Sequence, residues 1–249
     1  MIHYPTRPKL VFCFLDNVDA ANHVAYEQWW REAVGNVSRC AEGFCRALAF
    51  RADPRPPGGI FNSVLAPTFL TMVELSRAGG LLDGSISKML SPPERLVPER
   101  ALHGAYFEPN PTQRQGPFLD ESHPASIFLI VQDVQPADES AYNYWYDIDD
   151  GIERAAPKMG HYTERQRFDG FLRATRLKAV PFSMDRTEIP IVTKANHIEV
   201  FEIRSTAVMQ GEQYTAAAHE PPKVSSTKPP FKLWVRQAFE EVWSITEHC

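Results

Sequence analysis

Histidine is the side chain best suited to acid–base chemistry near neutral pH, because its ordinary pKa lies there. The chain has eight histidines, and three occupy places suited to chemistry. His23 follows an expected strand and precedes an aromatic segment, His161 lies in an insertion, and His197 opens an expected strand on the face that carries Glu199 and Phe201. Each also has a structural explanation, as a helix-capping, surface or hydrogen-bonded core residue.

Aromatic residues recur at helical spacing. Tyr26 and Trp30 are four residues apart, as are Tyr142 and Tyr146, so each pair shares one helix face. These four side chains are candidates for binding a flat substrate by stacking and by a phenol hydrogen bond. The alternative is that they belong to the hydrophobic core, as most aromatic helix faces over sheets do.

Charged residues supply the remaining candidates. Arg46 and Arg173 could hold an enolate or carboxylate, or could extend along the edge of a sheet. Asp150 ends an acidic run that reads as a solvated helix face. It could serve as an acid or base if burial raised its pKa.

The elements that must position these residues occur twice. Residues 25–30 and 141–146 share the pattern Ala-Tyr-x-x-Trp-aromatic, and residues 43–47 and 170–174 share Gly-Phe-x-Arg-Ala. Apolar runs and alternation predict four strands in each half. The expected strands are 10–15, 44–52, 68–75 and 102–108, then 127–131, 171–180, 197–203 and 232–240.

With the aromatic helices and weaker helical segments at 79–98 and 208–220, each half has the order β-α-β-β-α-β of a ferredoxin-like unit. We predict an α+β fold in which two ferredoxin-like βαββαβ repeats pack as an intramolecular, pseudo-dimeric α+β barrel. The expected domains are 1–108 and 125–249, joined by a Pro-rich linker at 109–124. The 21 prolines concentrate in connections of this kind.

Composition narrows the choice of partners. The net charge of -5 without a basic cluster excludes nucleic acid as an expected partner. The apolar run 10–15 is too short to span a membrane or to act as a secretory signal. Four cysteines without a CxxC pair or zinc spacing predict free thiols in a cytoplasmic protein, with no metal.

Residues 142–147 and 170–176 resemble the helix motif F-x-x-W-Y-D-x-x-H and the strand motif P-G-F-x-x-x-R of the EthD-like branch of the dimeric α+β barrel superfamily, and residues 67–76 resemble its third strand. The resemblance implies a barrel with an apolar pocket between each sheet and its covering helices. Its members include cofactor-free monooxygenases, cyclases, dehydratases, decarboxylases and isomerases, some of them in fungal polyketide pathways, and haem-binding branches. At the motif's histidine this chain has Val34 in the first half and Asp150 in the second.

Nucleotide-binding glycine loops, a G-x-S-x-G elbow and an H-E-x-x-H metal pair are all absent from the sequence, so we expect no cofactor. We predict a cofactor-independent isomerase/cyclase or lyase that acts on a small aromatic, polyketide-like phenol by histidine acid–base catalysis. Ring closure of the chalcone isomerase type fits this set of side chains. The alternatives are a cofactor-free monooxygenase or decarboxylase, or a non-catalytic ligand-binding protein. The chain is expected to be a monomer or homodimer.

Overall fold

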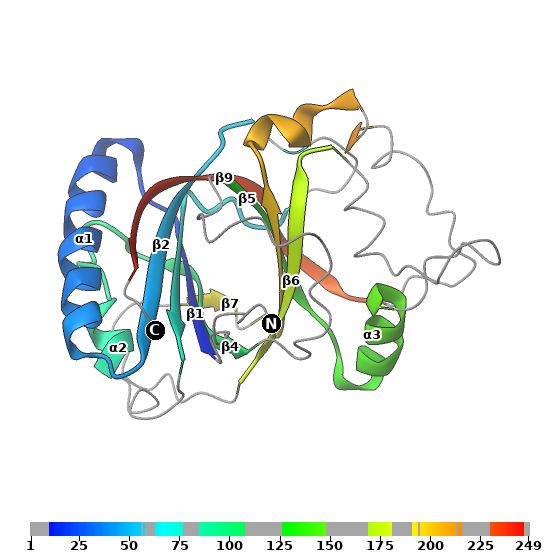
Figure 1. Cartoon of the computed structure of the whole chain (residues 1–249), viewed down its shortest axis with the longest axis horizontal. Helices are drawn as coiled ribbons and strands as arrows, with labels where there is room; N and C mark the ends of the chain where they lie inside the picture. The colour runs from blue at the N-terminus through cyan, green and yellow to red at the C-terminus, as the bar shows by residue number, and fades with distance from the viewer. Residues whose placement is uncertain are drawn as a thin grey trace, which may run out of the picture.

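The computed structural model describes residues 10–55, 57, 63–76, 85–107, 126–147, 169–180, 191–193, 195–212, 214–215 and 230–246. These residues form one sheet with helices on its outer side (Figure 1). The elements of the first half are β1 (Leu10–Asp16), η1 (Ala20–Asn22), α1 (His23–Cys40), β2 (Phe44–Ala52), β3 (Phe69–Leu75), α2 (Ser85–Met89) and β4 (Arg100–Phe107). Those of the second half are β5 (Ser126–Asp133), η3 (Pro136–Asp138), α3 (Glu139–Asp147), β6 (Phe171–Ala179), β7 (Ile191–Thr193), β8 (His197–Ile203), η4 (Thr206–Gln210) and β9 (Lys232–Thr246).

The strands close into a barrel. Their order is β1-β3-β2-β9-β5-β8-β6-β4-β7, and β1 also pairs with β4, so every strand except β7 belongs to a closed antiparallel ring. Within this ring the order β4-β1-β3-β2 of the first half recurs as β9-β5-β8-β6 in the second. The expected α+β barrel is confirmed.

The Gly-Phe-x-Arg-Ala repeat is a turn that opens β2 and β6. Gly43 has φ 77° and Gly170 has φ 93°, backbone conformations that favour glycine. In both halves the pairing register then shifts by one residue just after the phenylalanine. A Cβ atom on Gly170 would also lie 2.4 Å from Val208 Cγ2, which makes glycine the residue that fits there.

Alternation along the strands produces three buried clusters. One fills the barrel interior and includes Cys13, Leu129 and Ile198. The other two lie on the outer face, one under α1 around Tyr26 and one under α3 around Tyr142. Helices α1 and α3 therefore cover opposite sides of the barrel (Figure 1).

Several expectations need correction. The helix expected at 79–98 is α2, which ends at Met89 because Pro92 and Pro93 follow. The segment expected at 208–220 begins as the 3-10 helix η4, and the short strand β7 was not predicted. The linker 109–124 lies outside the described residues.

The structure corrects the expectation for one of the cysteines. Cys13 and Cys40 are free, but Cys45 is disulfide-bonded, so the prediction of a free thiol there is wrong. Across the described parts of the chain, we find no helix with the length and apolar character needed to cross a membrane.

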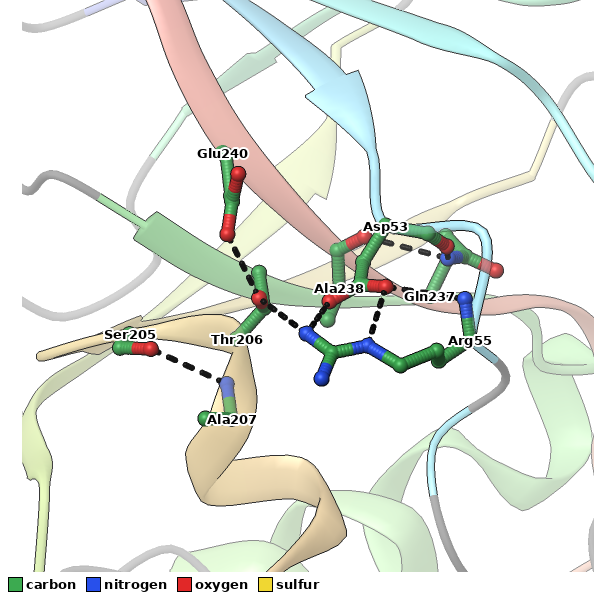
Figure 2. Close-up of polar contacts among 8 residues, drawn as sticks. All are labelled: Asp53, Arg55, Ser205, Thr206, Ala207, Gln237, Ala238 and Glu240. Atoms are coloured by element: carbon green, nitrogen blue, oxygen red, sulfur yellow. Dashed lines mark hydrogen bonds and ion pairs between the residues drawn. The ribbon is translucent and has the colours of Figure 1, made fainter.

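A polar network ties the loop after β2 to η4 and β9 (Figure 2). The buried Asp53 carboxylate accepts hydrogen bonds from the Arg55 side chain, from Nε at 2.9 Å and from Nη2 at 2.6 Å. Thr206 donates to Glu240 at 2.8 Å, and Gln237 donates to the Asp53 carbonyl at 2.7 Å. Segments far apart in sequence are thereby held together where β2 meets β9.

Asp53→Asn should lower the urea midpoint of unfolding at neutral pH. Hydrogen bonds from Arg55 are the largest cause that lowers the pKa of Asp53 below its ordinary value. A lowered carboxylate pKa contributes stability above the unfolded value of about 3.9, and this contribution is lost as pH falls below it. The difference between wild type and variant should therefore shrink below about pH 4. The control is Asp169→Asn, which removes an exposed ion pair with Arg204. Equal midpoints at neutral pH would contradict the prediction.

Candidate active site

Buried polar side chains gather on the outer face of β5, β6 and β8, under α3. Gln132, Arg176, His197 and Glu199 are each no more than 5% exposed, and Tyr142 of α3 is fully buried above them. The register brings them together, because Gln132 lies opposite His197 and Arg176 lies opposite Glu199. Cross-strand partners point to the same face of a sheet.

Tyr142 joins the helix to this face through its phenol. Its hydroxyl donates to the Glu199 carboxylate, and the amide oxygen of Gln132 lies 2.5 Å from the same hydroxyl. A phenol has one proton, so both contacts are satisfied together when the Gln132 amide turns its NH₂ group toward the phenol oxygen. Tyr142, Gln132 and Glu199 thus form one hydrogen-bonded unit.

His197 has a different environment. Its side chain is 1% exposed, its ring centroid lies 4.7 Å from that of Tyr142, and neither ring nitrogen has a hydrogen-bond partner among the described residues. Burial first, and then the positive charge of Arg176, lower the pKa of His197 from 6.5 to about 4. The imidazole is therefore neutral at neutral pH and keeps a lone pair that can accept a proton.

The edge of this cluster is an ion pair. Lys178, opposite His197 on β6, pairs with Glu139 at the start of α3. The charge of Glu139 favours protonation of His197, while Lys178 disfavours it. The pair attaches the first turn of α3 to β6 and so positions Tyr142.

The corresponding place under α1 is closed. Tyr26 donates to Asp16 at 2.6 Å, and Arg100 donates to the other oxygen of the same carboxylate, also at 2.6 Å. Burial and the charge of Asp16 raise the pKa of Tyr26. Trp30 donates to Thr71. These polar groups are satisfied within the protein, which is what a structural network requires.

The predicted site residues are distributed over both halves. His23 is partly buried, with Nε2 3.1 Å from the carbonyl oxygen of Val18, and it lies on the α1 side together with Tyr26 and Trp30. Arg46 forms two hydrogen bonds with Glu74, at 2.5 and 2.7 Å.

The remaining predicted residues belong to the second half. Of the ten, Tyr142 and His197 meet in one cluster. The backbone of Arg173 lies in β6 opposite Glu202. The side chains of Arg173 and Tyr146, and all of Asp150 and His161, lie outside what the structure describes.

Three residues of the cluster were missed: Gln132, Arg176 and Glu199. Glu199 shares the face of His197 in the alternation of one strand, and that signal was visible in the sequence. Arg176 and Gln132 come from other strands, so their proximity depends on the register between strands. The described residues contain no group of three or more His, Cys, Asp or Glu placed to hold a metal ion.

A hollow of about 350 Å³ lies beside the network of Figure 2 and is lined by Arg51, Asp53, Arg55, Glu240 and Glu241, among others. Arg55 pairs with Asp53, and Arg51 pairs with Glu27 of α1. Because both arginines are already paired with carboxylates of the protein, the α3 cluster is the stronger candidate for binding an anion.

Comparison with known proteins supports the fold. No family model and no curated protein matches the chain. An anthrone oxidase-like protein superposes with a TM-score of 0.54 at 9% identity, covering 96% of this chain and 93% of that one. The dye-decolorizing protein from V. cholerae superposes with a TM-score of 0.54 at 12% sequence identity, covering 98% of this chain and 95% of that one. A protein described as a monooxygenase, from Fusobacterium nucleatum subsp. nucleatum, superposes with a TM-score of 0.50 at 11% sequence identity, covering 99% of this chain and 97% of that one. The chain therefore shares its fold with these three proteins.

His197→Phe should flatten the pH dependence of stability between about pH 6.5 and 4. In wild type the unfolded state binds a proton in this window and the native state does not, so stability falls as pH falls, by up to about 3 kcal/mol. Phe69 is the residue of β3 that matches His197 of β8, because it precedes Leu75, the partner of Phe44, by as many residues as His197 precedes Ile203, the partner of Phe171. The ring centroid of Phe69 lies 4.6 Å from that of Tyr26, so phenylalanine at position 197 preserves this ring packing. Urea unfolding of both proteins at several pH values measures the effect. Identical slopes would show that His197 is not buried in its neutral form.

Proposed function

We propose that the chain is a cofactor-independent enzyme, an isomerase/cyclase or lyase, that acts on a small aromatic or polyketide-like phenol with His197 as acid–base residue. The observation that carries the proposal is the state of His197, whose imidazole is buried and neutral and, within the part of the chain that the structure describes, has no hydrogen-bond partner on either ring nitrogen. A buried polar group in this state costs free energy, so a catalytic or binding role accounts for it better than packing does.

The chemistry follows from the neighbouring groups. His197 takes a proton from a phenol or from a carbon next to a carbonyl, and the electron pair stays on the substrate as a phenolate or enolate. The positive charge of Arg176 stabilises the negative oxygen, and the ring of Tyr142 packs beside His197. The anion then adds to an enone within the same molecule, and the imidazolium returns its proton to the adjacent carbon. Atoms and electrons balance without a cofactor.

The domain organisation forms part of the same proposal. The shared strand order and the paired glycine turns support two ferredoxin-like repeats, 1–108 and 125–249, joined by 109–124. The EthD-like assignment rests on its motif residues, which fall on α3 and β6 beside the cluster. Because the barrel closes within one chain, a monomer is sufficient and a homodimer is compatible.

A second candidate is a cofactor-free monooxygenase, favoured by the likeness to the anthrone oxidase-like protein. Its first step is the same removal of a phenol proton. The two functions differ in what the phenolate attacks, an enone of the same molecule or molecular oxygen, so oxygen consumption separates them.

Turnover of phenolic enones such as 2′-hydroxychalcone, and of anthrone, followed by mass spectrometry with and without oxygen, tests the proposal. We expect products of unchanged mass, or of mass lowered by one water, without oxygen uptake. His197→Phe should lower kcat/KM by about 10² to 10⁴, the usual contribution of general acid–base catalysis.

Other outcomes assign other functions. Oxygen uptake with incorporation of oxygen supports the monooxygenase, and loss of carbon dioxide from a carboxylated phenol supports the decarboxylase. His23→Gln tests the first half, and a loss there comparable to that of His197→Phe would move the site to α1. Binding without turnover across the panel would indicate a carrier and contradict the proposal.

A further inference from the structure

The repeat makes a position-by-position comparison of the two outer faces possible. The paired turns align β2 with β6 and β3 with β8, because Phe44 lies opposite Leu75 just as Phe171 lies opposite Ile203. Counting from these pairs matches the positions under α1 with those under α3. The matched residues are Ala49 with Arg176, Phe69 with His197, and Thr71 with Glu199.

The place under α1 leaves little room for a ligand. A hollow of about 10 Å³ remains, lined by Tyr26, Trp30, Ala49 and Phe69 among others, which is about enough for one water molecule. Trp243 fills the other side, with its ring centroid 4.7 Å from that of Trp30. This face is packed as core.

The place under α3 carries an ionisable residue at each of the three matched positions. Arg176 is 5% exposed, Glu199 is fully buried, and His197 is 1% exposed. Burying ionisable groups costs free energy. The α1 half forms the same strands and the same turn with alanine, phenylalanine and threonine at these positions, so the fold itself does not require them.

The arrangement suits a flat anion. Arg236 of β9, Ile130 of β5, Glu199 of β8 and Arg176 of β6 follow one another in a single cross-strand row. Arg176 lies directly opposite Glu199, whereas Arg236 lies two strands away and donates to the Tyr214 hydroxyl and the Pro57 carbonyl. Guanidinium groups bind carboxylates and phenolates through charge-assisted hydrogen bonds. The Tyr142 ring beside His197 offers a surface for stacking.

We infer that each chain binds one flat organic anion, under α3 and not under α1, and that Arg176 selects for its negative charge. This inference rests on the proposed function in that it places the substrate in the same cluster and names its class, an aromatic acid or an acidic phenol.

Isothermal titration calorimetry at neutral pH with two probes of one shape tests the inference. The probes are 1-hydroxy-2-naphthoate and its neutral amide, 1-hydroxy-2-naphthamide. We expect one equivalent of the acid to bind per chain, with an affinity at least about tenfold above that of the amide. Arg176→Gln should abolish the preference, and Arg176→Lys should retain part of it. Arg39→Gln is the matched control, because it removes one exposed positive charge from α1.

Binding of two equivalents, equal affinity for acid and amide, an unchanged preference in Arg176→Gln, or no binding of either probe below about 1 mM would each overturn the inference. Urea unfolding shows whether each variant is folded. If Arg176→Gln does not fold, Arg176→Lys and the comparison of the two probes on the wild type still test the inference. Charge-selective binding of one equivalent, with turnover insensitive to His197→Phe, would refute the proposed function and leave this inference standing. Loss of turnover in His197→Phe, together with equal binding of the acid and the amide, would refute this inference and leave the proposed function standing.

Discussion

Closure of the barrel within one chain is the constraint on which the rest of the structure depends. A four-stranded antiparallel sheet has two edges with unpaired backbone groups, which must be paired or protected. Here β2 pairs with β9 and β4 pairs with β6, so each half covers the edges of the other. Much of the interior is filled by apolar side chains from both halves. Buried ionisable residues lie on both faces, because Glu74 shares the interior face of Met72 and pairs with Arg46, whereas His197 lies on the outer face under α3.

The long strand β9 carries much of this closure. Its first part pairs with β5 and its later part with β2, so it passes from one half to the other (Figure 1). Residues near the crossing, Gln237 and Glu240, bind the loop after β2 and the start of η4. Side-chain hydrogen bonds and strand pairing therefore both fix β9 at the point where it passes from β5 to β2. Correct placement of β9 also positions Arg236 in the row that contains Glu199.

The sequence predicted most of the fold because the fold is repetitive. Alternation located the strands of the barrel, and the two Gly-Phe motifs marked turns whose positive φ values explain the glycines. The site was only partly predictable. His197 and Tyr142 were identified by residue type, whereas Arg176 and Gln132 lie beside them through cross-strand registers that the pattern of one strand does not define. The strand β7 is three residues long and too short to show a pattern.

The two halves also differ in which strand supplies the carboxylate that binds the helix tyrosine. Under α1 it is Asp16 of β1, balanced by Arg100 of β4 directly opposite. Under α3 the matching pair is Gln132 and Leu233, and both residues are uncharged. Because both members of the ion pair are replaced, neither position holds a buried charge without its partner. The carboxylate that binds Tyr142 comes instead from Glu199 of β8. Moving the charge by one strand places it opposite Arg176 and two residues from His197, so the hydrogen bond that holds α3 to the sheet belongs to the same cluster as the candidate base. A duplicated barrel permits this change, because the α1 half keeps its own closed network.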